Sequence, residues 1–513
     1  MRRPAPLRLA VTPRVAVPGA VLLALILVFV LAWATRPGAA RVTVPAGQRT
    51  AVTSITRSCP PAAPGDTAPR VSMIALPAAR SGTASSGAAA AKPAATTPAG
   101  TATFSGILAA PGAATGGKKP AGPAAGTKPV TVTAAGAVTS VTVPGGGGAA
   151  VAATGQMAEG FEAEQTDASG TGVVTCTHPG SDMWFVGTGQ ADGASQVWLY
   201  LMNSGNLTAS ADVTILTDTG QQTGLGSAIT VAPNQYVAEN VTPYVRGSQA
   251  IALRVQANSG QVAASVWEGG TGGGAWLPQA NAPTKSLVIP GLTVASSAAR
   301  LFVVVPGSGD AQLKVVAYTP AGASQQFPGT PVDASAGAVT PLALSSLGAS
   351  AAGLKLTSSV PIVAGVLVPG TGIGSFTTAV APVSEQGVVA ANPGARGVTV
   401  GLLLTAPSGA TRATISVISA DGTVTTPAAD QNVTVAAGHT LAVPVARPAD
   451  GGRDPFAIVV TPQPGAGPLY AVRVVTSGTG GLSAPLSSLL PVSSAMTSIT
   501  LPPTQDSYTA VLP

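Results

Sequence analysis

The sequence predicts an all-β protein, and composition and residue alternation carry that prediction. Of its 513 residues, 63 are Gly and 46 are Pro, whereas charged residues make up only 9%. Short Val-, Thr- and Ile-rich runs between Gly and Pro turns are typical of strands, not of helical bundles. Runs such as "ASADVTI" (209–215) alternate apolar with polar residues, as expected for antiparallel sheets with one buried and one solvated face.

The N-terminus carries a membrane signal. Residues 15–34, "VAVPGAVLLALILVFVLAWA", are apolar and follow a basic tail, residues 1–14. A helix of that length spans a hydrocarbon core of about 30 Å, and the basic flank places the tail in the cytoplasm. Because residues 32–34, "AWA", resemble a cleavage site, a single-pass transmembrane anchor and a cleaved signal peptide both stay open. Either way the rest of the chain is expected outside the cytoplasm, on the cell membrane or secreted.

The region after the membrane signal is predicted to be a partial β domain, residues 41–183, with a long insertion. Residues 80–128 consist mostly of Ala, Gly, Ser, Thr, Pro and Lys, and only Phe104, Ile107 and Leu108 could bury useful apolar surface. Such a segment cannot offset its ordering entropy, so the sequence predicts a disordered insertion there.

The remainder of the chain contains a repeat. "VAASVWEGGTG" (262–272) recurs as "IVAGVLVPGTG" (362–372) and again as "LYAVRVVTSGTG" (469–480). A period near 100 residues is too long for a solenoid and matches a β-sandwich. We therefore expect tandem Ig-like antiparallel sandwiches at 184–280, 295–380 and 392–485, with residues 486–513 adding C-terminal strands that complete an earlier sheet.

The two cysteines, Cys59 and Cys176, are predicted to form a disulfide. An even number of cysteines in an exported chain favours pairing, and the alternative is two free thiols. Closing so long a loop would stabilise the fold by roughly 3–5 kcal/mol.

The histidines do not predict a catalytic or metal site. His178 follows Cys176 closely, but the other histidine, His439, lies in the third predicted sandwich. Structural zinc needs about four ligands and catalytic zinc three, and a Cys-His nucleophile needs a free thiolate. "THPGSD" (177–182) is instead typical of a Pro-Gly turn. No G-x-S-x-G elbow precedes a helix, so a Ser-His-Asp hydrolase is disfavoured, and no cofactor motif is present.

Two further groups of side chains are candidates for binding. The acidic group Glu159, Glu162, Glu164 and Asp167 is spaced too loosely for calcium and is expected to form a solvated face. Among the aromatic residues near 184–280, Trp198 and Trp267 are expected to be buried. Trp276, in a Gly-rich stretch, is the candidate for contact with a glycan.

Several motifs together resemble a known family. They are "TRSCP" (56–60) with one later Cys, "WFVGTG" (184–189) and "WLYLMNSGNLTASADVTILTDTG" (198–220). With the basic anchor and the repeats, the chain resembles uncharacterised actinobacterial envelope proteins, a domain of unknown function often encoded near glycosyltransferase genes. The resemblance implies location and architecture, and it brings no catalytic residue.

These observations favour a membrane-anchored, extracytoplasmic protein without catalytic activity, a structural or binding component of the bacterial cell envelope. The expected contacts are the lipid bilayer, through residues 15–34, and anionic envelope polymers or glycans. The anionic polymers would be contacted by the basic residues of segment 35–150. Nucleic acid is not expected as a partner, because the basic excess lies in this segment and not on an aromatic-lined face. The alternatives are a carbohydrate-binding or glycosylation-associated accessory protein and, less favoured, a secreted hydrolase.

Overall fold

The computed structural model describes residues 24, 26–31, 48–76, 99–110, 129–143, 146–190, 195–225, 228–270, 272–293, 299–326, 331–344, 351–449 and 452–501. Two compact units are present, residues 51–499, here called the body, and residues 1–50 with 500–513. In the smaller unit, residues 26–31 are helical, and the strands β1 (Gln48–Ala51) and β37 (Ser498–Leu501) pair. Most of the predicted transmembrane segment 15–34, and all of residues 1–14, lie outside the described residues.

The body begins with a module of eight strands in two sheets. They are β2 (Ser54–Cys59), β3 (Arg70–Ile74), β4 (Ala102–Ala109), β5 (Val130–Val132), β6 (Thr139–Thr142), β7 (Gly148–Thr154), β8 (Glu162–Thr166) and β9 (Val173–Thr175). Sheet 1 of the module has the order β2-β7-β4, with β5 on β4, and sheet 2 has the order β6-β3-β8-β9. All of these pairs are antiparallel.

The same strand order recurs in three further modules. The second module contains β10 (Asp182–Thr188), β11 (Gln196–Asn203), β12 (Ala209–Thr217), β13 (Gly220–Gln222), β14 (Ile229–Val231), β15 (Gln235–Asn240), β16 (Ala250–Ser259), β17 (Ala263–Gly270) and β18 (Gly273–Leu277). Its sheet 1 is β10-β16-β12, with β13 and β14 on β12, and its sheet 2 is β15-β11-β17-β18. Each strand of the first module thus has a counterpart here, and β13 is an added hairpin strand.

The third module contains β19 (Thr284–Leu292), β20 (Arg300–Val304), β21 (Ala311–Thr319), β22 (Gly322–Gln326), β23 (Val332–Ala334), β24 (Val339–Ala343), β25 (Ala352–Val368) and β26 (Ser375–Thr378). Its two sheets share one long strand. The first part of β25 pairs with β19 and β21 in sheet 1, and the second part pairs with β20 and β26 in sheet 2. One strand therefore takes the place of two consecutive strands of the other modules.

The fourth module contains β27 (Gly387–Asn392), β28 (Val398–Ala406), β29 (Thr411–Ile418), β30 (Val424–Thr425), β31 (Val433–Val435), β32 (His439–Pro444), β33 (Phe456–Pro462), β34 (Tyr470–Ser477) and β35 (Leu486–Pro491). Sheet 1 is β27-β33-β29, with β30 and β31 on β29, and sheet 2 is β32-β28-β34-β35. The short strand β36 (Ser493–Ser494) pairs with β27. The 3-10 turns η2 (Gly155–Met157), η4 (Thr242–Tyr244), η5 (Ala428–Asp430) and η6 (Gly481–Ser483) join strands.

The all-β prediction is confirmed, but the first module is not partial: it has the full strand set of the others. The prediction of disorder is wrong for residues 102–109, which form β4 inside the predicted insertion. Phe104 and Ile107 are 1% and 2% exposed, so this short run does bury apolar surface. The repeats also extend beyond the predicted limits, since strand β19 begins at Thr284 and β35 ends at Pro491.

Each module buries a hydrophobic core between its own two sheets. In the first module, Ile55, Phe104 and Val151 of sheet 1 pack with Val71 and Met73 of sheet 2. The other three modules have corresponding clusters. This arrangement follows from strands whose inward residues are mostly Val, Leu, Ile and Ala.

The modules also pack on one another, sheet 1 of each against sheet 2 of the next. Between the first and second modules, Ile107 and Ala150 contact Trp198 and Trp267, and β4 pairs in parallel with β15. Between the second and third, β10 contacts β20 and β25. Between the third and fourth, β19 contacts β28 and β34. Trp198 and Trp267 are buried as predicted, but between modules and not inside one.

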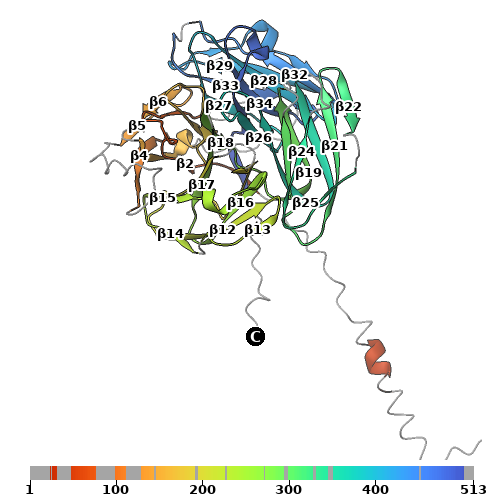
Figure 1. Ribbon diagram of the computed structural model, residues 1–513. Coiled ribbons are helices and arrows are strands. Elements are labelled where there is room, and N and C mark those ends of the chain that lie inside the picture. The colour runs from red at the N-terminus through yellow and green to blue at the C-terminus, as the bar shows by residue number, and fades with distance from the viewer. Residues whose placement is uncertain are drawn as a thin grey trace, which may run out of the picture. The chain divides into compact units, whose positions relative to one another are not determined.

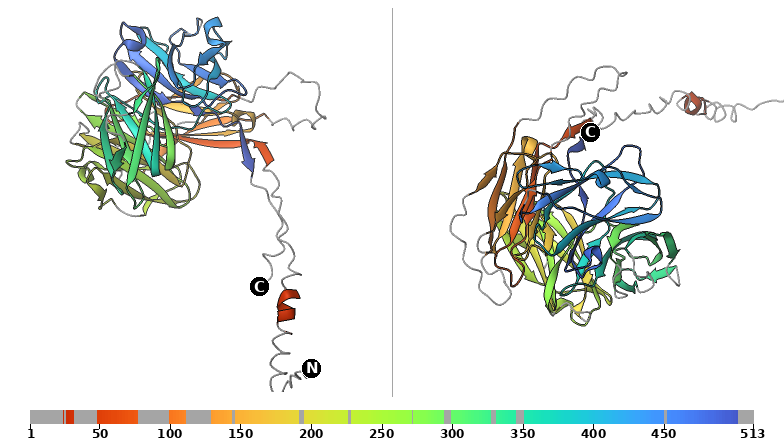
Figure 2. Two further views of the ribbon diagram at one scale, coloured as in Figure 1. Left: turned by 90° about the vertical axis from the view of Figure 1, so that its right-hand side faces the viewer. Right: turned by 90° about the horizontal axis from the view of Figure 1, so that it is seen from above.

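The fourth module packs in the same way on the first, which closes a ring. Strand β27 contacts β3 and β8, and Val388 and Ala390 share a cluster with Ile74 and Val138. Figure 1 shows the four modules in sequence around a centre marked by β18 and β26, and Figure 2 shows the same body from two other sides. The last strands of the modules contact one another in the same cyclic order, β9, β18, β26, β35 and again β9.

The acidic group 159–167, expected on a solvated face, is largely buried, and that expectation is wrong. Glu159, Glu162 and Glu164 are 7%, 2% and 2% exposed. Glu164 accepts a hydrogen bond of 2.6 Å from the backbone N–H of Ala391, across the contact that closes the ring. Burial and the neighbouring Glu162 raise the pKa of Glu164 to about 8, although the Ala391 hydrogen bond opposes the shift.

Candidate functional site

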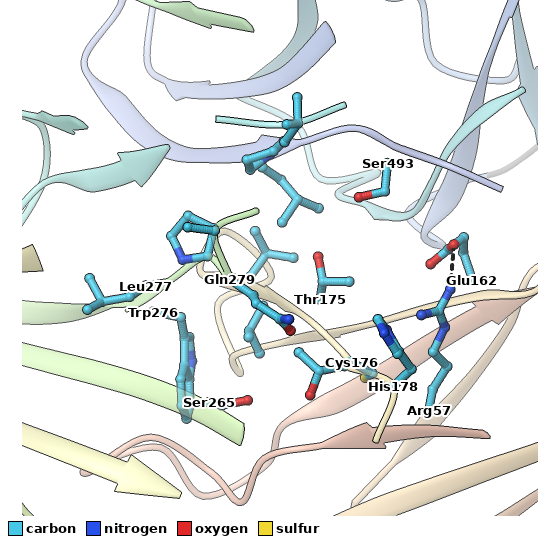
Figure 3. Close-up of a pocket in the computed structure, with 18 of the residues that line it drawn as sticks. Arg57, Glu162, Thr175, Cys176, His178, Ser265, Trp276, Leu277, Gln279 and Ser493 are labelled. Carbon is cyan, nitrogen blue, oxygen red and sulfur yellow. Dashed lines mark hydrogen bonds and ion pairs between the residues drawn. The ribbon is translucent and has the colours of Figure 1, made fainter. Parts of the chain in front are cut away.

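The candidate site is a cavity where the last strands of the four modules meet. It has a volume of about 240 Å³ and is lined by residues from every module, including Thr175, Trp276, Val380 and Leu489. Figure 3 draws 18 of the lining residues and labels ten, with Trp276 and Ser265 on one side and Arg57 and Glu162 on the other. The cavity is therefore a product of ring closure, since no single module encloses it.

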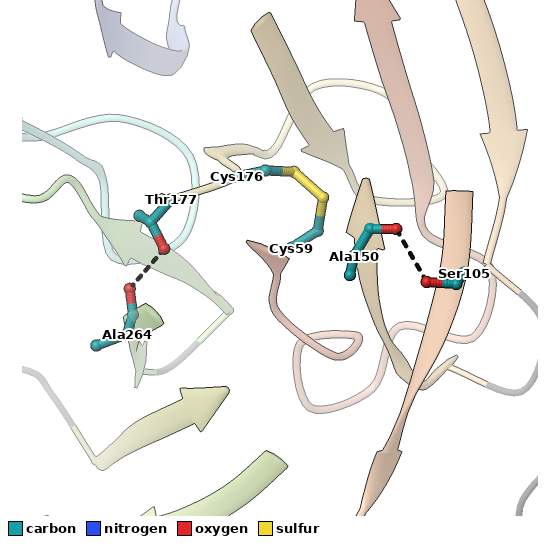
Figure 4. Close-up of a disulfide and its surroundings, with 6 residues drawn as sticks. All are labelled: Cys59, Ser105, Ala150, Cys176, Thr177 and Ala264. Atoms are coloured by element: carbon teal, nitrogen blue, oxygen red, sulfur yellow. Dashed lines mark hydrogen bonds between the residues drawn. A yellow bond between two sulfur atoms is a disulfide. The ribbon is translucent and has the colours of Figure 1, made fainter. Parts of the chain in front are cut away.

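The disulfide between Cys59 and Cys176, predicted from the sequence, is present (Figure 4), and Cys176 lines the cavity. It joins the end of β2 to the residue after β9, a sequence separation of 117. Beside it, Ser58 and Thr177 exchange two backbone hydrogen bonds, and the Thr177 hydroxyl donates to Ala264 O of the second module at 3.3 Å. The disulfide and these hydrogen bonds thus hold in place the segment that carries His178.

An ion pair lies deep in the cavity wall. The Arg57 guanidinium donates from Nη2 to Glu162 Oε1 at 2.7 Å, and the two side chains are only 8% and 3% exposed. Burial raises the pKa of Glu162, while the charge of Arg57 and its hydrogen bond pull in the opposite direction. The Nε of Arg57 has no hydrogen-bond partner among the described residues. The Nε–H of this guanidinium is therefore a hydrogen-bond donor that Glu162 does not use.

His178 lies at the rim of the cavity, with its side chain exposed. Partial desolvation, and secondarily the positive charge of Arg57, lower its pKa below the usual value near 6.5. The imidazole is therefore predominantly neutral at pH 7. Because Cys176 is in a disulfide, the sequence neighbours Cys176 and His178 do not form a thiolate-imidazole pair.

The other sequence candidates lie apart from one another. His439 begins β32 in the fourth module, where its Nδ1 is 2.8 Å from Ala437 O. Asp182 binds Arg254 with both carboxylate oxygens, at 2.9 and 2.8 Å. Within the described ranges, no group of three or more His, Cys, Asp and Glu residues is arranged to hold a metal ion.

Trp276, the candidate glycan contact, lines the cavity from β18. The sequence suggested a Gly-rich linker, but Gly273–Leu277 is a strand, in which Trp276 lies opposite Trp267. Gly274 is required there, since a Cβ would come within 2.1 Å of the Trp267 ring. Trp276 is half-buried and contacts Tyr200, with a centroid distance of 5.6 Å and an interplanar angle of 52°.

The polar residues that accompany Trp276 were missed from the sequence. They include Arg57, Ser265, Gln279, Asn281 and Ser493. Ser265 is 1% exposed, and its hydroxyl has no hydrogen-bond partner in the part of the chain that the structure describes. The one signal that could have found Arg57 is its position in "AVTSITRSC" (51–59), because a lone charge inside an alternating strand requires a buried partner.

The comparisons with known proteins identify a family and no activity. No curated protein matches this chain. Among solved structures, Streptomyces avermitilis alpha-L-rhamnosidase complexed with L-rhamnose is similar at 10% identity, over 62% of this chain and 49% of that one. This chain thus spans about half of that enzyme's length, and at a TM-score of 0.11 the likeness carries no argument.

One family model covers more than half of the chain. The model describes a family of unknown function, DUF5719, and matches residues 124–446. That range begins shortly before β5 of the first module and ends in the fourth module, and it includes the Trp276 side of the cavity. The chain therefore belongs to the DUF5719 family, a family of unknown function.

Proposed function

We propose that this protein is an exported, membrane-anchored component of the cell envelope that binds a glycan in its central cavity and has no catalytic activity. The observation that carries the proposal is the position of Trp276. Its ring lines a cavity together with Gln279, Asn281 and Ser493, which can donate and accept hydrogen bonds. An aromatic face beside neutral polar groups is suited to the apolar face and the hydroxyls of a sugar ring.

The size of the cavity favours one or two sugar units. Its volume of about 240 Å³ is below the roughly 300–1,000 Å³ of drug-sized ligand sites. We also infer that the four modules are Ig-like β-sandwiches, which is supported by their antiparallel sheets and the cores between them.

Replacement of Trp276 by alanine should weaken glycan binding at least tenfold, because the stacking surface is lost. Trp276→Phe keeps an aromatic face against Tyr200 and serves as the matched control that should retain most of the affinity. Binding of the purified full chain is measured on a glycan array and then by calorimetry. Unchanged binding of Trp276→Ala, with circular dichroism like that of the wild type, would contradict the proposal.

The anchor is proposed from residues 15–34 and supported by the helical residues 26–31. Phe29 is 79% exposed and Leu27 is 56% exposed, which suits a lipid environment. Among the described residues, the structure contains no helix long and apolar enough to cross a membrane.

A fractionation experiment tests the anchor. The full chain should stay with the membrane after an alkaline carbonate wash, and a chain whose first 34 residues are replaced by a cleavable signal peptide should be released. A mature N-terminus directly after Ala34 would show a cleaved signal instead. Recovery of the full chain in the cytoplasm would contradict export.

A further inference from the structure

The charges around the central cavity compensate one another, and this restricts the ligand. Arg57 and Glu162 are the charged side chains among the described residues that line it, and they form the 2.7 Å ion pair. Partial desolvation, and secondarily the charge of Arg57, lower the pKa of His178 at the rim, so at neutral pH it adds little charge. A ligand with a net charge would lose its hydration in the cavity without meeting an unpaired opposite charge.

Two buried polar atoms at the cavity lack partners within the described ranges. Arg57 is 6% exposed and its Nε–H has no acceptor, and Ser265 is 1% exposed and its Oγ has no partner. Buried polar groups in native proteins are normally hydrogen-bonded, so each such exception requires an explanation. In Figure 3, Ser265 lies beside Trp276, and Arg57 lies on the opposite side near His178. Arg57 and Ser265 therefore line the cavity from opposite walls, and these two atoms lie just beneath its surface.

We propose that the cavity takes a neutral sugar unit, and that small side-chain rotations on binding let one sugar hydroxyl accept a hydrogen bond from Arg57 Nε and another bond to Ser265 Oγ. This inference rests on the proposed glycan binding and names its ligand class. A hydroxyl can both donate and accept, so it satisfies the Arg57 donor and either role of the serine. The sugar ring would then lie between them, against the Trp276 face.

The test is a panel of methyl glycosides titrated into the full chain in detergent. The probes are neutral hexosides, the corresponding hexuronic acids and 2-amino-2-deoxyhexosides, compared by calorimetry at pH 7. We expect the neutral sugars to bind at least tenfold more tightly than either charged class. Equal or tighter binding of a charged class would overturn this inference while leaving glycan binding intact. Binding of none of the probes would contradict the proposed function as well.

Ser265→Ala provides the second arm of the test. This variant should lose about tenfold in affinity for the neutral sugars without loss of folding stability, because it removes a hydroxyl that has no protein partner. Ser58→Ala is the matched control. Ser58 is also fully buried with an unpartnered hydroxyl, but it does not line the cavity. Equal affinities of the two variants would show that Ser265 does not contact the ligand.

Discussion

Cys59→Ala combined with Cys176→Ala should lower the free energy of unfolding by about 3–5 kcal/mol. The disulfide closes a loop with a sequence separation of 117, so its loss returns a large conformational entropy to the unfolded chain. Both cysteines are fully buried, and Thr177, which is hydrogen-bonded to Ser58, connects the first module to the second through its bond to Ala264. The loss is measured by denaturant titration of the oxidised wild type and the variant.

The single variants provide the control for the disulfide. Cys59→Ala and Cys176→Ala break the same bond, so each alone should account for nearly all of the loss seen in the double variant. If the losses were additive, the effect would come from packing of the two side chains and not from the crosslink. Wild-type stability of the double variant would show that the disulfide contributes nothing.

Arg57→Met should destabilise the protein by about 3–5 kcal/mol at pH 8, because it leaves the Glu162 carboxylate buried without its partner. The effect depends on pH. Burial already raises the pKa of Glu162 above its unfolded value. A carboxyl with a raised pKa contributes most to stability below its unfolded pKa, and that contribution is lost as the pH rises. The variant should therefore be closer to the wild type at pH 5 than at pH 8.

A second ion pair provides a matched control for Arg57. Arg254 binds Asp182 at 2.8 Å, but these side chains are 32% and 38% exposed. Arg254→Met should cost about 1 kcal/mol or less, since solvent screens this pair. The double variant Arg57→Met, Glu162→Leu should recover most of the stability, because it removes both charges. Equal losses for Arg57→Met and Arg254→Met would contradict the assignment of a buried pair.

Much of the fold could be predicted from local sequence patterns. The features that could not be predicted depend on contacts between residues far apart in the sequence. Alternation and the repeated Gly-Thr-Gly ends predicted the strands of the later modules. The disulfide was predicted from the even number of cysteines and from the expectation that the chain is exported. In contrast, β4 lies in a low-complexity tract, where Phe104 and Ile107 are too few to make a periodic signal. Their burial is decided by the sheet around them.

The candidate site was harder to predict than the fold, because four modules build it. The sequence singled out Trp276 as a candidate glycan contact because it lies in a Gly-rich stretch. That stretch is β18, and Trp276 lines the cavity from it. Arg57 and Glu162 are 105 residues apart, and neither has a sequence neighbour that identifies the other. Glu164 likewise finds its partner, Ala391, only because the first and fourth modules meet. Burial of these glutamates opposes the usual preference of carboxylates for the surface.

Closure of the ring also limits how this architecture can vary in evolution. An open array of repeats can gain or lose a copy at either end, because each copy contacts only its neighbours. Here the contact between β27 and β8 joins the two ends of the series, so the copy number is fixed by the angle between adjacent modules. Duplication of one module would open the ring and remove the central cavity. Related sequences are therefore expected to diverge in their loops and in the residues that line the cavity, while the number of modules stays at four.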